Sequence, residues 1–410
     1  MTFLWGVSGS GHQTEGDNTG SDTWYLEHVD PTVFAEPSGK ACDSWNRWRD
    51  DVALAAGMGL NAYRFSVEWA RVEPEPGAFD ETALDHYEAI VDHCLERGLA
   101  PVVTFNHFTS PHWFAERGGW LDPDAPEVFA RYCDRVAARF ADRIAVAVTL
   151  NEPNLARLLT WLDLPPHIRD RERATLEAAG RAAGVPRYRV GNVMLPEEMD
   201  AIADGMTAGH RAARAAIKTH RPDLPVGFSL AIVDDLVAGD DATLRDRKRS
   251  EVYARWLDLA REDDFVGVQN YERLTYDALG AVPPPAGAPR NQMGSAIEPG
   301  SLAGAVRYAY QSTGRPILVT EHGMATPDDT LRAAFLEPAL DALHRAMADG
   351  VPVLGYLHWT LLDNFEWIFG YAFQYGLHEV DRTTFERTPK PSAKAYADLV
   401  AAYLAPSRTG

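Results

Sequence analysis

Two glutamates each stand at the end of a short apolar run. Glu152 ends the run AVAVTLNEP that begins at Ala145, and Glu321 ends the run PILVTEHG that begins at Pro316. Neither lies in a helical pattern, where a solvated carboxylate would be the ordinary interpretation. Such a pair can hold one carboxyl group neutral as a proton donor and the other ionised as a nucleophile. Cleavage of a glycosidic bond requires these two groups.

Further polar residues stand at the ends of the other apolar runs. They are Gln13 and Glu15, Arg64 and Glu68, Asn106 and His107, Asn151, Gln269 with Asn270 and Tyr271, His322, and His358 with Trp359, Asp363 and Glu366. Carboxylates, amides and aromatic rings dominate this set, lysine is missing from it, and no glycine-rich phosphate loop accompanies it. Trp359 and Trp367 stand on either side of Glu366, and indole faces suit the C–H surfaces of sugars. The set favours a neutral polyhydroxylated ligand.

Eight short runs rich in β-branched and aromatic residues carry these side chains. They predict strands that begin at Leu4, Ala62, Ala100, Ala145, Val226, Phe265, Pro316 and Val353. Amphipathic stretches at residues 80–97, 126–141 and 329–349 predict helices between them. This alternation predicts an α/β fold, a (β/α)8 TIM barrel, because closing the sheet removes its edges. We expect the fourth and seventh strands on opposite sides of the ring, with Glu152 and Glu321 converging over its mouth.

No linker, like-charge block or internal repeat divides the chain. Residues 1–410 are therefore predicted to form a single catalytic domain, with long loops at the carboxyl ends of the strands. Two regions are expected to be loops because their apolar residues show no clear helix or strand spacing. They are residues 155–206 and the proline-rich residues 282–289. The charge runs at residues 169–173 and 245–249 are interpreted as solvated faces.

Composition excludes several classes of partner. Of the 410 residues, 46% are hydrophobic and 24% charged, which is typical of a globular protein. Lys plus Arg number 39 and Asp plus Glu 59, and the formal net charge of −20 disfavours nucleic acid and anionic membrane surfaces. No apolar run suits a membrane span, and residues 1–16 have no signal-peptide pattern. Cys42, Cys94 and Cys133 lack CxxC spacing, so we expect reduced thiols, no metal and a cytoplasmic protein.

Seven longer motifs contain the polar residues and together span nearly the whole chain. They are FLWGVSGSGHQTEG at Phe3, YRFSVEWARVEPEPGAFD at Tyr63, TLNEPN at Thr149, DFVGVQNYERL at Asp264, VTEHG at Val319, HWTLLDNFEWIFGY at His358 and RTPKPSA at Arg387. Each short motif alone is a weak signal, but seven motifs in the correct order are specific. The set resembles glycoside hydrolase family one, the retaining β-glucosidase family.

This resemblance implies an enzyme that hydrolyses small-molecule β-glucosides by double displacement, without a metal or an organic cofactor. It implies that Glu321 is the nucleophile and Glu152 the general acid/base. Arg64 and Tyr271 are expected to hydrogen-bond the nucleophile, and Asn151 to contact the sugar 2-hydroxyl. The residues expected to bind the other hydroxyls and the face of the sugar ring are Gln13, His107, Glu366, Trp367 and Trp359.

The sequence departs from the family pattern at four positions near the expected site. They are Phe108, where tryptophan is common, His322 and Gln269, where asparagine is usual or frequent, and Asn154, where tryptophan is common. Residues 155–206 also differ from the usual loop after the acid/base motif. The sugar-binding side is therefore better specified than the side that binds the aglycone.

Two alternatives remain open at this point. The same machinery serves a β-galactosidase, a β-xylosidase or a disaccharide-releasing glycosidase, and the motifs select neither a sugar epimer, an aglycone nor an oligomeric state. A sugar-binding barrel without turnover belongs to a different class, and the retention of both Glu152 and Glu321 argues against it. Five histidines are assigned no function: His12, His86, His93, His210 and His220.

Overall fold

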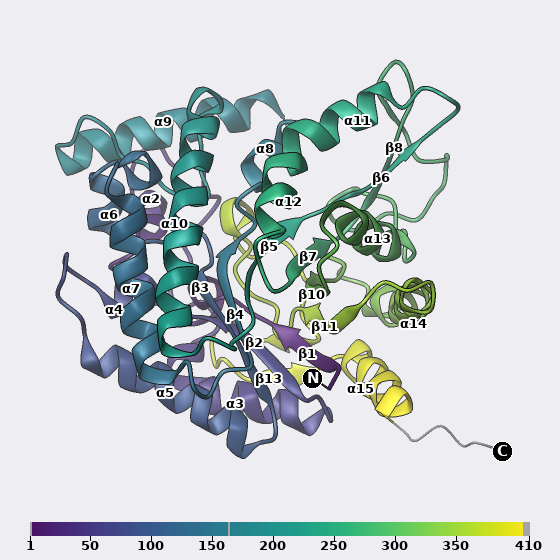
Figure 1. The fold of residues 1–410 in the computed structure, drawn as a ribbon, viewed down its shortest axis with the longest axis horizontal. Coiled ribbons are helices and arrows are strands. Elements are labelled where there is room, and N and C mark those ends of the chain that lie inside the picture. The colour runs from purple at the N-terminus through teal and green to yellow at the C-terminus, as the bar shows by residue number, and fades with distance from the viewer. Residues whose placement is uncertain (1, 163–164, 405–410) are drawn as a thin grey trace.

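Eight parallel strands close into a ring in the computed structural model, which describes residues 2–162 and 165–404 (Figure 1). Their bounds are β1 Leu4–Ser8, β2 Ala62–Ser66, β3 Ala100–Asn106, β4 Val146–Asn151, β5 Val226–Ala231, β7 Val266–Asn270, β10 Ile317–His322 and β11 Val353–Trp359. Around the ring the order is β1, β11, β10, β7, β5, β4, β3 and β2. Each predicted run forms one of these strands, and the predicted (β/α)8 TIM barrel is confirmed.

Apolar side chains fill the ring below its carboxyl end. They form one buried cluster of Leu4, Ala62, Val102, Val146, Val148, Phe265, Leu318 and Leu357. Side chains two residues apart on a strand share a face, so Arg64 follows Ala62 on the inner face of β2. The same rule places polar residues of the other strands above this apolar floor. The apolar cluster therefore fills the barrel interior and leaves the polar side chains at its carboxyl end.

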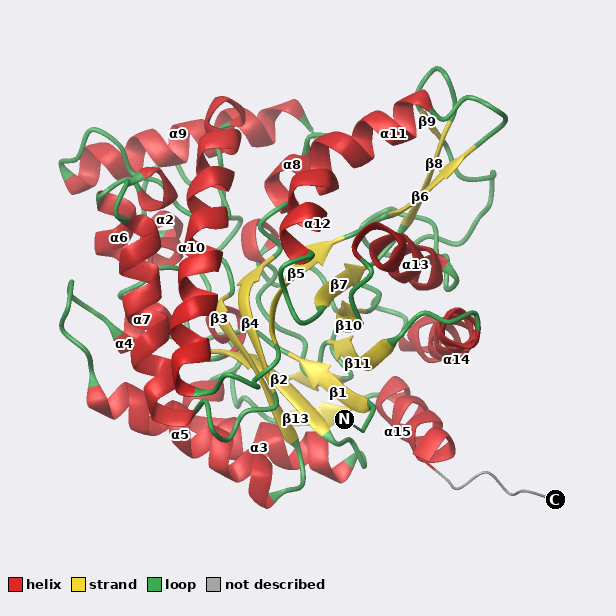
Figure 2. Ribbon diagram, viewed as in Figure 1, coloured by secondary structure: helices red, strands yellow, loops and turns green. Residues whose placement is uncertain are grey.

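A ring of helices covers the outside of the barrel (Figure 2). In chain order these are α3 Ser44–Gly57, α5 Glu81–Glu96, α7 Ala125–Phe140, α10 Met199–His220, α12 Arg255–Ala260, α13 Ser301–Thr313, α14 Asp329–Ala348 and α15 Pro391–Leu404. The three predicted helices are confirmed as α5, α7 and α14. Helix α5 begins where predicted because the Asp80 carboxylate accepts from the backbone N–H groups of Thr82 and Ala83.

Further helices and strands occupy the connections. The helices are α1 Gly11–Thr14, α2 Asp22–Glu27, α4 Trp69–Val72, α6 His112–Glu116, η1 Gly119–Leu121, α8 Leu155–Leu159, α9 Pro166–Ala183, η2 Pro196–Glu198, α11 Thr243–Arg249, η3 Ser250–Ala254 and η4 Trp367–Phe369. The strands are β6 Asp234–Val237, β8 Arg273–Tyr276 and β9 Ala281–Val282, which form one sheet, and the pair β12 His378–Val380 and β13 Arg387–Pro389. Figure 2 shows the three-stranded sheet extending away from the barrel at the upper right.

The prediction of a loop over residues 155–206 is wrong. This region contains α8, α9, η2 and the start of α10, although residues 163–164 lie outside the described part. Helix α9 is mostly polar, and it packs through a narrow stripe in which Leu176 and Ala179 join a cluster with Leu26 of α2. Gly184 ends it in a left-handed conformation with φ of 70°. The loop prediction for residues 282–289 is confirmed beyond the last residue of β9.

The two charge runs differ in their environment. Residues 169–173 lie in α9 with exposed or half-buried side chains, as predicted. The interpretation of residues 245–249 as a solvated face is wrong for Lys248, which is fully buried. Its Nζ lies 2.6 Å from the carboxylate of Asp235 in β6. A buried ammonium requires such a partner, and that partner comes from a different element.

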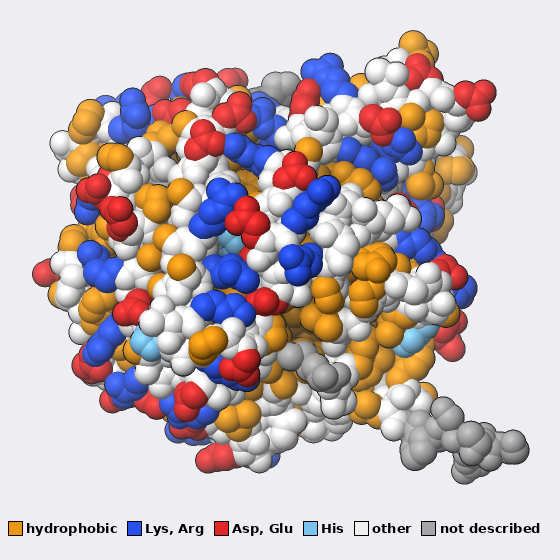
Figure 3. Space-filling model, viewed as in Figure 1, with side chains coloured by type: hydrophobic (Ala, Val, Ile, Leu, Met, Phe, Trp, Pro, Cys, Tyr) orange, Lys and Arg blue, Asp and Glu red, His pale blue; other side chains and the backbone are white. Residues whose placement is uncertain are grey.

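Acidic and basic side chains are mixed on the face that carries α10 and α12 (Figure 3). Ion pairs between α10 and the turn after α12 include Arg211 with Glu262 and Lys218 with Asp264. All three cysteines are buried and free, as expected for core thiols. None of the helices within residues 2–162 and 165–404 is long and apolar enough to cross a membrane.

Candidate active site

The two glutamates lie at the carboxyl end of the barrel. Glu152 directly follows β4 and Glu321 lies within β10. In the closed ring β5 and β7 separate these strands, so β4 and β10 are not diametrically opposite, contrary to the expectation from strand number. Glu152 is 9% exposed and Glu321 is 4% exposed. They share one site, because Arg64 donates both to Glu321 and to Asn151, the residue before Glu152.

Arg64 and Tyr271 hold the carboxylate of Glu321 from two sides. Arg64 donates from Nη1 to Oε1 of Glu321 over 2.6 Å, and the Tyr271 hydroxyl donates to Oε2 over 2.6 Å. The guanidinium is itself fixed, because its Nη1 also donates to Ser8 Oγ and its Nε donates to Thr104 Oγ1. Both oxygens of Glu321 therefore receive strong, directed donors.

Asn151 is oriented by its neighbours. Its Oδ1 accepts from Arg64 Nη2 over 2.6 Å and from Gln269 Nε2 over 2.8 Å. A guanidinium can only donate, so the oxygen of the amide must face Arg64. The Asn151 NH2 group then points toward His107 Nε2, 3.2 Å away. Burial and the nearby charge of Arg64 lower the pKa of His107, which keeps its imidazole neutral.

The two glutamates differ in their electrostatic surroundings. Burial and the charge of Glu321 raise the pKa of Glu152 well above its ordinary value, while Arg64 opposes this rise. Burial also raises the pKa of Glu321, but Arg64 and the Tyr271 hydrogen bond hold that rise down. The Glu152 carboxyl group therefore holds a proton more tightly than the Glu321 carboxyl group does. This difference favours Glu152 as the acid of the pair and Glu321 as the carboxylate.

Gln13, Glu366 and Trp367 lie together beside this pair. Gln13 Nε2 donates to the Phe365 carbonyl over 2.7 Å and lies 3.4 Å from Glu366 Oε2. Burial and the charge of Glu321 raise the pKa of Glu366 to about 8, and the hydrogen bond from Gln13 opposes the rise. Such a carboxyl group can both donate to and accept from sugar hydroxyls near neutral pH.

Aromatic rings form a layered wall around the same space. The His107 imidazole stacks near-parallel to the indole of Trp359 and to that of Trp367, with centroid distances of 5.8 and 6.1 Å. Trp359 ends β11 and is buried, whereas Trp367 starts η4 and is half-buried. All ten sequence-predicted site residues thus lie at the carboxyl end of the barrel or in the connections that follow its strands.

The departures from the family pattern have defined contacts. Asn154 binds the backbone of Ala231 through both ends of its amide and so ties the connection after β4 to the end of β5. The Phe108 ring meets Trp367 edge-on at 5.2 Å. His322 is buried, its Nδ1 lies 2.9 Å from the Tyr356 hydroxyl, and burial lowers its pKa to about 3. These residues shape the surroundings of the site.

Several residues of the site were not identified from sequence. Ser8 and Thr104 orient Arg64, and strand alternation places both on the inner face of the ring, a signal that could have found them. Tyr375 is buried with its ring edge-on to Tyr271 at 5.8 Å, but no periodic pattern marks it. Within the described residues, no group of three or more His, Cys, Asp or Glu side chains is arranged to hold a metal ion.

Comparison with known proteins connects this geometry with a family. The family model for "Glycosyl hydrolase family 1" matches residues 1–183 and 268–403. A bifunctional beta-D-glucosidase/beta-D-fucosidase of Bifidobacterium breve is 30% identical over 98% of each chain. Thermostable beta-glucosidase B of Thermobispora bispora is 31% identical over 97% of this chain and 89% of its own length.

Solved structures agree in fold along the whole chain. The apo structure of a beta-glucosidase, 1317, superposes with a TM-score of 0.94 at 40% identity and covers 98% of this chain and 99% of its own. The beta-glycosidase BGL167 superposes with a TM-score of 0.91 at 46% identity and covers 100% of this chain and 98% of its own. The chain therefore belongs to glycosyl hydrolase family 1, and it is a glycoside hydrolase.

Proposed function

We propose that this enzyme is a retaining β-glucosidase in which Glu321 is the nucleophile and Glu152 the general acid/base. One observation carries the assignment of roles. Arg64 and Tyr271 donate to both oxygens of Glu321, whereas burial and the charge of Glu321 keep the proton on Glu152. A nucleophile must be ionised and an acid must be neutral in the same resting state.

The proposed reaction has two displacements. Glu321 attacks the anomeric carbon and forms a glycosyl ester while the bond to the aglycone oxygen breaks, and Glu152 transfers its proton to that oxygen. Esterification removes the charge of Glu321, which lowers the pKa of Glu152 just when Glu152 must act as a base. Glu152 then takes a proton from water, the oxygen of that water attacks the anomeric carbon, and the ester bond breaks to restore Glu321. The reaction balances without a metal or an organic cofactor.

The substrate is proposed to be a small unphosphorylated β-glycoside. Asn151 is proposed to bind the 2-hydroxyl. Its oxygen is occupied by Arg64 and Gln269, and this supports its NH2 group, which is directed toward His107, as the donor. The residues proposed to bind the other hydroxyls and the face of the ring are Gln13, His107, Glu366, Trp367 and Trp359. The Bifidobacterium breve relative is named as both a glucosidase and a fucosidase, which supports fucose as a second sugar.

We further propose that residues 1–410 act as a single catalytic domain and that the enzyme works in a reducing compartment such as the cytoplasm. The three free and buried thiols support this compartment, because disulfides are rare there.

A panel of aryl β-glycosides tests the proposed function. The panel contains the glucoside, galactoside, fucoside and xyloside, together with a disaccharide that carries a second sugar on the 6-hydroxyl. We expect the glucoside to give the highest kcat/KM, and we expect proton NMR to show the β-anomer as the first product. A first-formed α-anomer would contradict double displacement, and absence of turnover on the whole panel would favour a non-catalytic barrel.

The variant Glu321→Gln tests the assigned nucleophile. An amide cannot form the glycosyl ester, so we expect nearly complete loss of turnover. Glu337→Gln on the exposed face of α14 is the matched control and should retain full activity. A Glu321→Gln variant that retains more than about a tenth of the wild-type kcat, a loss under roughly 1.4 kcal/mol, rejects the assignment.

A further inference from the structure

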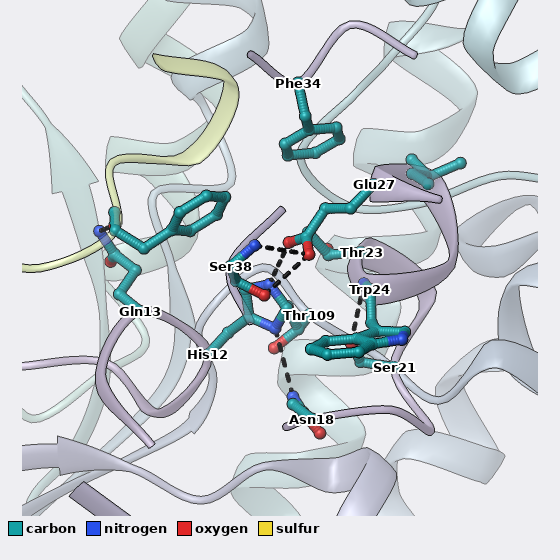
Figure 4. A network of polar contacts seen from close by, with 12 residues as sticks. His12, Gln13, Asn18, Ser21, Thr23, Trp24, Glu27, Phe34, Ser38 and Thr109 are labelled. Atoms are coloured by element: carbon teal, nitrogen blue, oxygen red, sulfur yellow. Dashed lines mark hydrogen bonds and ion pairs between the residues drawn. The ribbon is translucent and has the colours of Figure 1, made fainter. Parts of the chain in front are cut away.

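His12 is a fully buried residue of α1 that directly precedes the site residue Gln13 (Figure 4). Its Nε2 lies 2.8 Å from Oε1 of Glu27, the last residue of α2. Its Nδ1 lies 3.4 Å from the amide nitrogen of Asn18. Both ring nitrogens therefore have a polar partner. The plane of the imidazole is fixed from two sides.

The partners of His12 are fixed in turn. The backbone N–H and the hydroxyl of Ser38 both donate to Oε2 of Glu27, over 2.9 and 2.7 Å. Asn18 Nδ2 donates to Oε2 of Glu68 over 2.9 Å. A carboxylate only accepts, so this contact orients the Asn18 amide with its N–H groups toward Glu68 and His12. His12 Nδ1 is then an acceptor, and its Nε2–H donates to Glu27.

The face of the His12 ring lies against the indole of Trp367. Their centroids are 5.7 Å apart and their planes differ by 7°. Trp367 has a backbone φ of 49°, in the left-handed region that bulky residues rarely adopt. A residue in this conformation persists only where its surroundings determine it. On another side, the Phe108 ring meets the same indole edge-on.

We propose that His12 is a positioning residue for Trp367, and that the buried chain Ser38, Glu27, His12 and Asn18 sets the angle at which the indole meets the sugar. The inference rests on the proposed role of Trp367 as a ligand of a sugar hydroxyl. In this proposal His12 acts on the sugar only through the indole of Trp367. Its loss should therefore weaken one sugar contact and leave the other contacts of the site unchanged.

The experiment measures which hydroxyl Trp367 serves and whether His12 controls that contact. Aryl β-glucosides that lack the 3-, the 4- or the 6-hydroxyl are compared with the full aryl β-glucoside, and each ratio of kcat/KM values gives the penalty for one missing hydroxyl. The hydroxyl that Trp367 binds is the one whose removal costs less in Trp367→Phe than in the wild type. These ratios do not depend on the fraction of folded enzyme, so partial unfolding cannot imitate the effect.

We expect His12→Gln to shrink the same penalty as Trp367→Phe by roughly three- to tenfold, as loss of one hydrogen bond does, and to leave the other two penalties within about twofold. Glu27→Gln should act in the same direction. Its amide oxygen can accept from Ser38, but its NH2 group then faces His12 Nε2 and conflicts with the tautomer that Asn18 selects. This second variant tests the inference should His12→Gln fold poorly.

His210 provides a matched control. It is also buried, its Nδ1 lies 2.7 Å from the Thr149 hydroxyl, its Nε2 lies 3.1 Å from the Asp263 carboxylate, and its ring packs against Phe228. Both His210→Gln and His12→Gln should lower thermal stability, but His210→Gln should leave all three hydroxyl penalties unchanged. A merely structural role for His12 predicts the same result for both variants.

The outcomes separate this inference from the proposed function. If Trp367→Phe shrinks one penalty while His12→Gln and Glu27→Gln leave every penalty within twofold of the wild type, the positioning role is overturned and the proposed function stands. If Trp367→Phe changes no penalty, the role of Trp367 fails and the positioning role fails with it. If Glu321→Gln retains turnover, the catalytic assignment fails, independently of the hydroxyl penalties.

Discussion

Arg64 joins Glu321 to Asn151 through one guanidinium group, with Nη1 on the carboxylate and Nη2 on the amide oxygen, each over 2.6 Å. Burying such an ion pair gives little net stability, because desolvation opposes the attraction. The guanidinium group instead fixes the position of Glu321, the proposed nucleophile, relative to Asn151, the amide proposed to bind the 2-hydroxyl. One side chain thus orients both of these groups.

Arg64→Lys should lower kcat/KM by roughly a hundredfold. A single ammonium group cannot reach all the acceptors that the guanidinium group of Arg64 contacts, so two charge-assisted hydrogen bonds are lost. The control is Arg387→Lys, which alters another buried guanidinium group, one that donates to both oxygens of Asp51 over 2.8 and 3.1 Å. That variant should lower stability and leave kcat per folded enzyme unchanged. Equal kinetic losses in both variants would contradict a special role for Arg64.

Most of the fold follows from local patterns in the sequence. The eight strands and helices α5, α7 and α14 each have a strong period or a helix-start signal, and these signals depend on neighbouring residues only. Barrel closure then brings the strand ends together, and so the predicted site residues converge. Helix α9 was missed because its buried stripe is narrow, even though Pro166 and Gly184 mark its two ends.

The polar partners of buried residues could not be predicted in the same way. Lys248 looked like part of a solvated charge run, but its partner Asp235 lies on a different element. His12 and Glu27 are likewise separated by a turn and a helix. Such pairs depend on how elements pack, and no spacing rule along the chain describes that packing. The residues that orient the site are therefore harder to find than the residues that form it.

The titration of Asp22 should lower the stability of the protein as pH rises from about 4 to 7. Its Oδ1 accepts from the backbone of Thr23 and of Ser110, but burial raises its pKa to about 7. The folded state thus binds this proton more tightly than the unfolded state, in which the pKa has its ordinary value of 3.8. The stabilisation is present below about pH 4 and is lost as pH rises through about 7.

Asp22→Asn should remove this titration and keep the acceptor for both backbone N–H groups. The difference in the free energy of unfolding between wild type and variant should change by roughly up to 1.4 kcal/mol per pH unit between pH 5 and 7. Urea unfolding at several pH values measures it. Asp258→Asn, on the exposed face of α12, is the control. A difference that stays constant with pH would show that Asp22 is ionised in the folded protein.

The enzyme should prefer an aryl β-glucoside to its 6-phosphate. Among the described residues, Glu366 has the amide of Gln13 as its side-chain hydrogen-bond partner, and no Lys or Arg forms an ion pair with its carboxyl group. The pKa of Glu366 is raised to about 8, so the group becomes anionic as pH rises through that value. The ratio of kcat/KM values for the two substrates should therefore increase from pH 7 to pH 9. A preference for the phosphate would contradict the proposed role of Glu366.

Glu152→Ala should distinguish the two proposed roles of Glu152 by substrate choice. Phenols of low pKa depart without protonation, so the variant should form the glycosyl enzyme from them at a near-normal rate and then stall, because no base activates water. Substrates with poor leaving groups should lose far more, since their departure needs the proton of Glu152. The measurement is kcat/KM across a series of aryl β-glucosides, whose slope against phenol pKa should be steeper in the variant than in the wild type.

Azide should then restore turnover of Glu152→Ala on the activated substrates. The small anion can enter the space that the carboxyl group leaves, and it attacks the anomeric carbon of the glycosyl enzyme without needing a base. Attack from the face opposite Glu321 gives a β-glycosyl azide, which proton NMR identifies. Glu321→Ala is the matched comparison: it lacks the group that forms the ester, so attack of azide on the substrate itself would give the α-azide. An α-azide from Glu152→Ala would therefore mean that the roles of Glu152 and Glu321 are reversed.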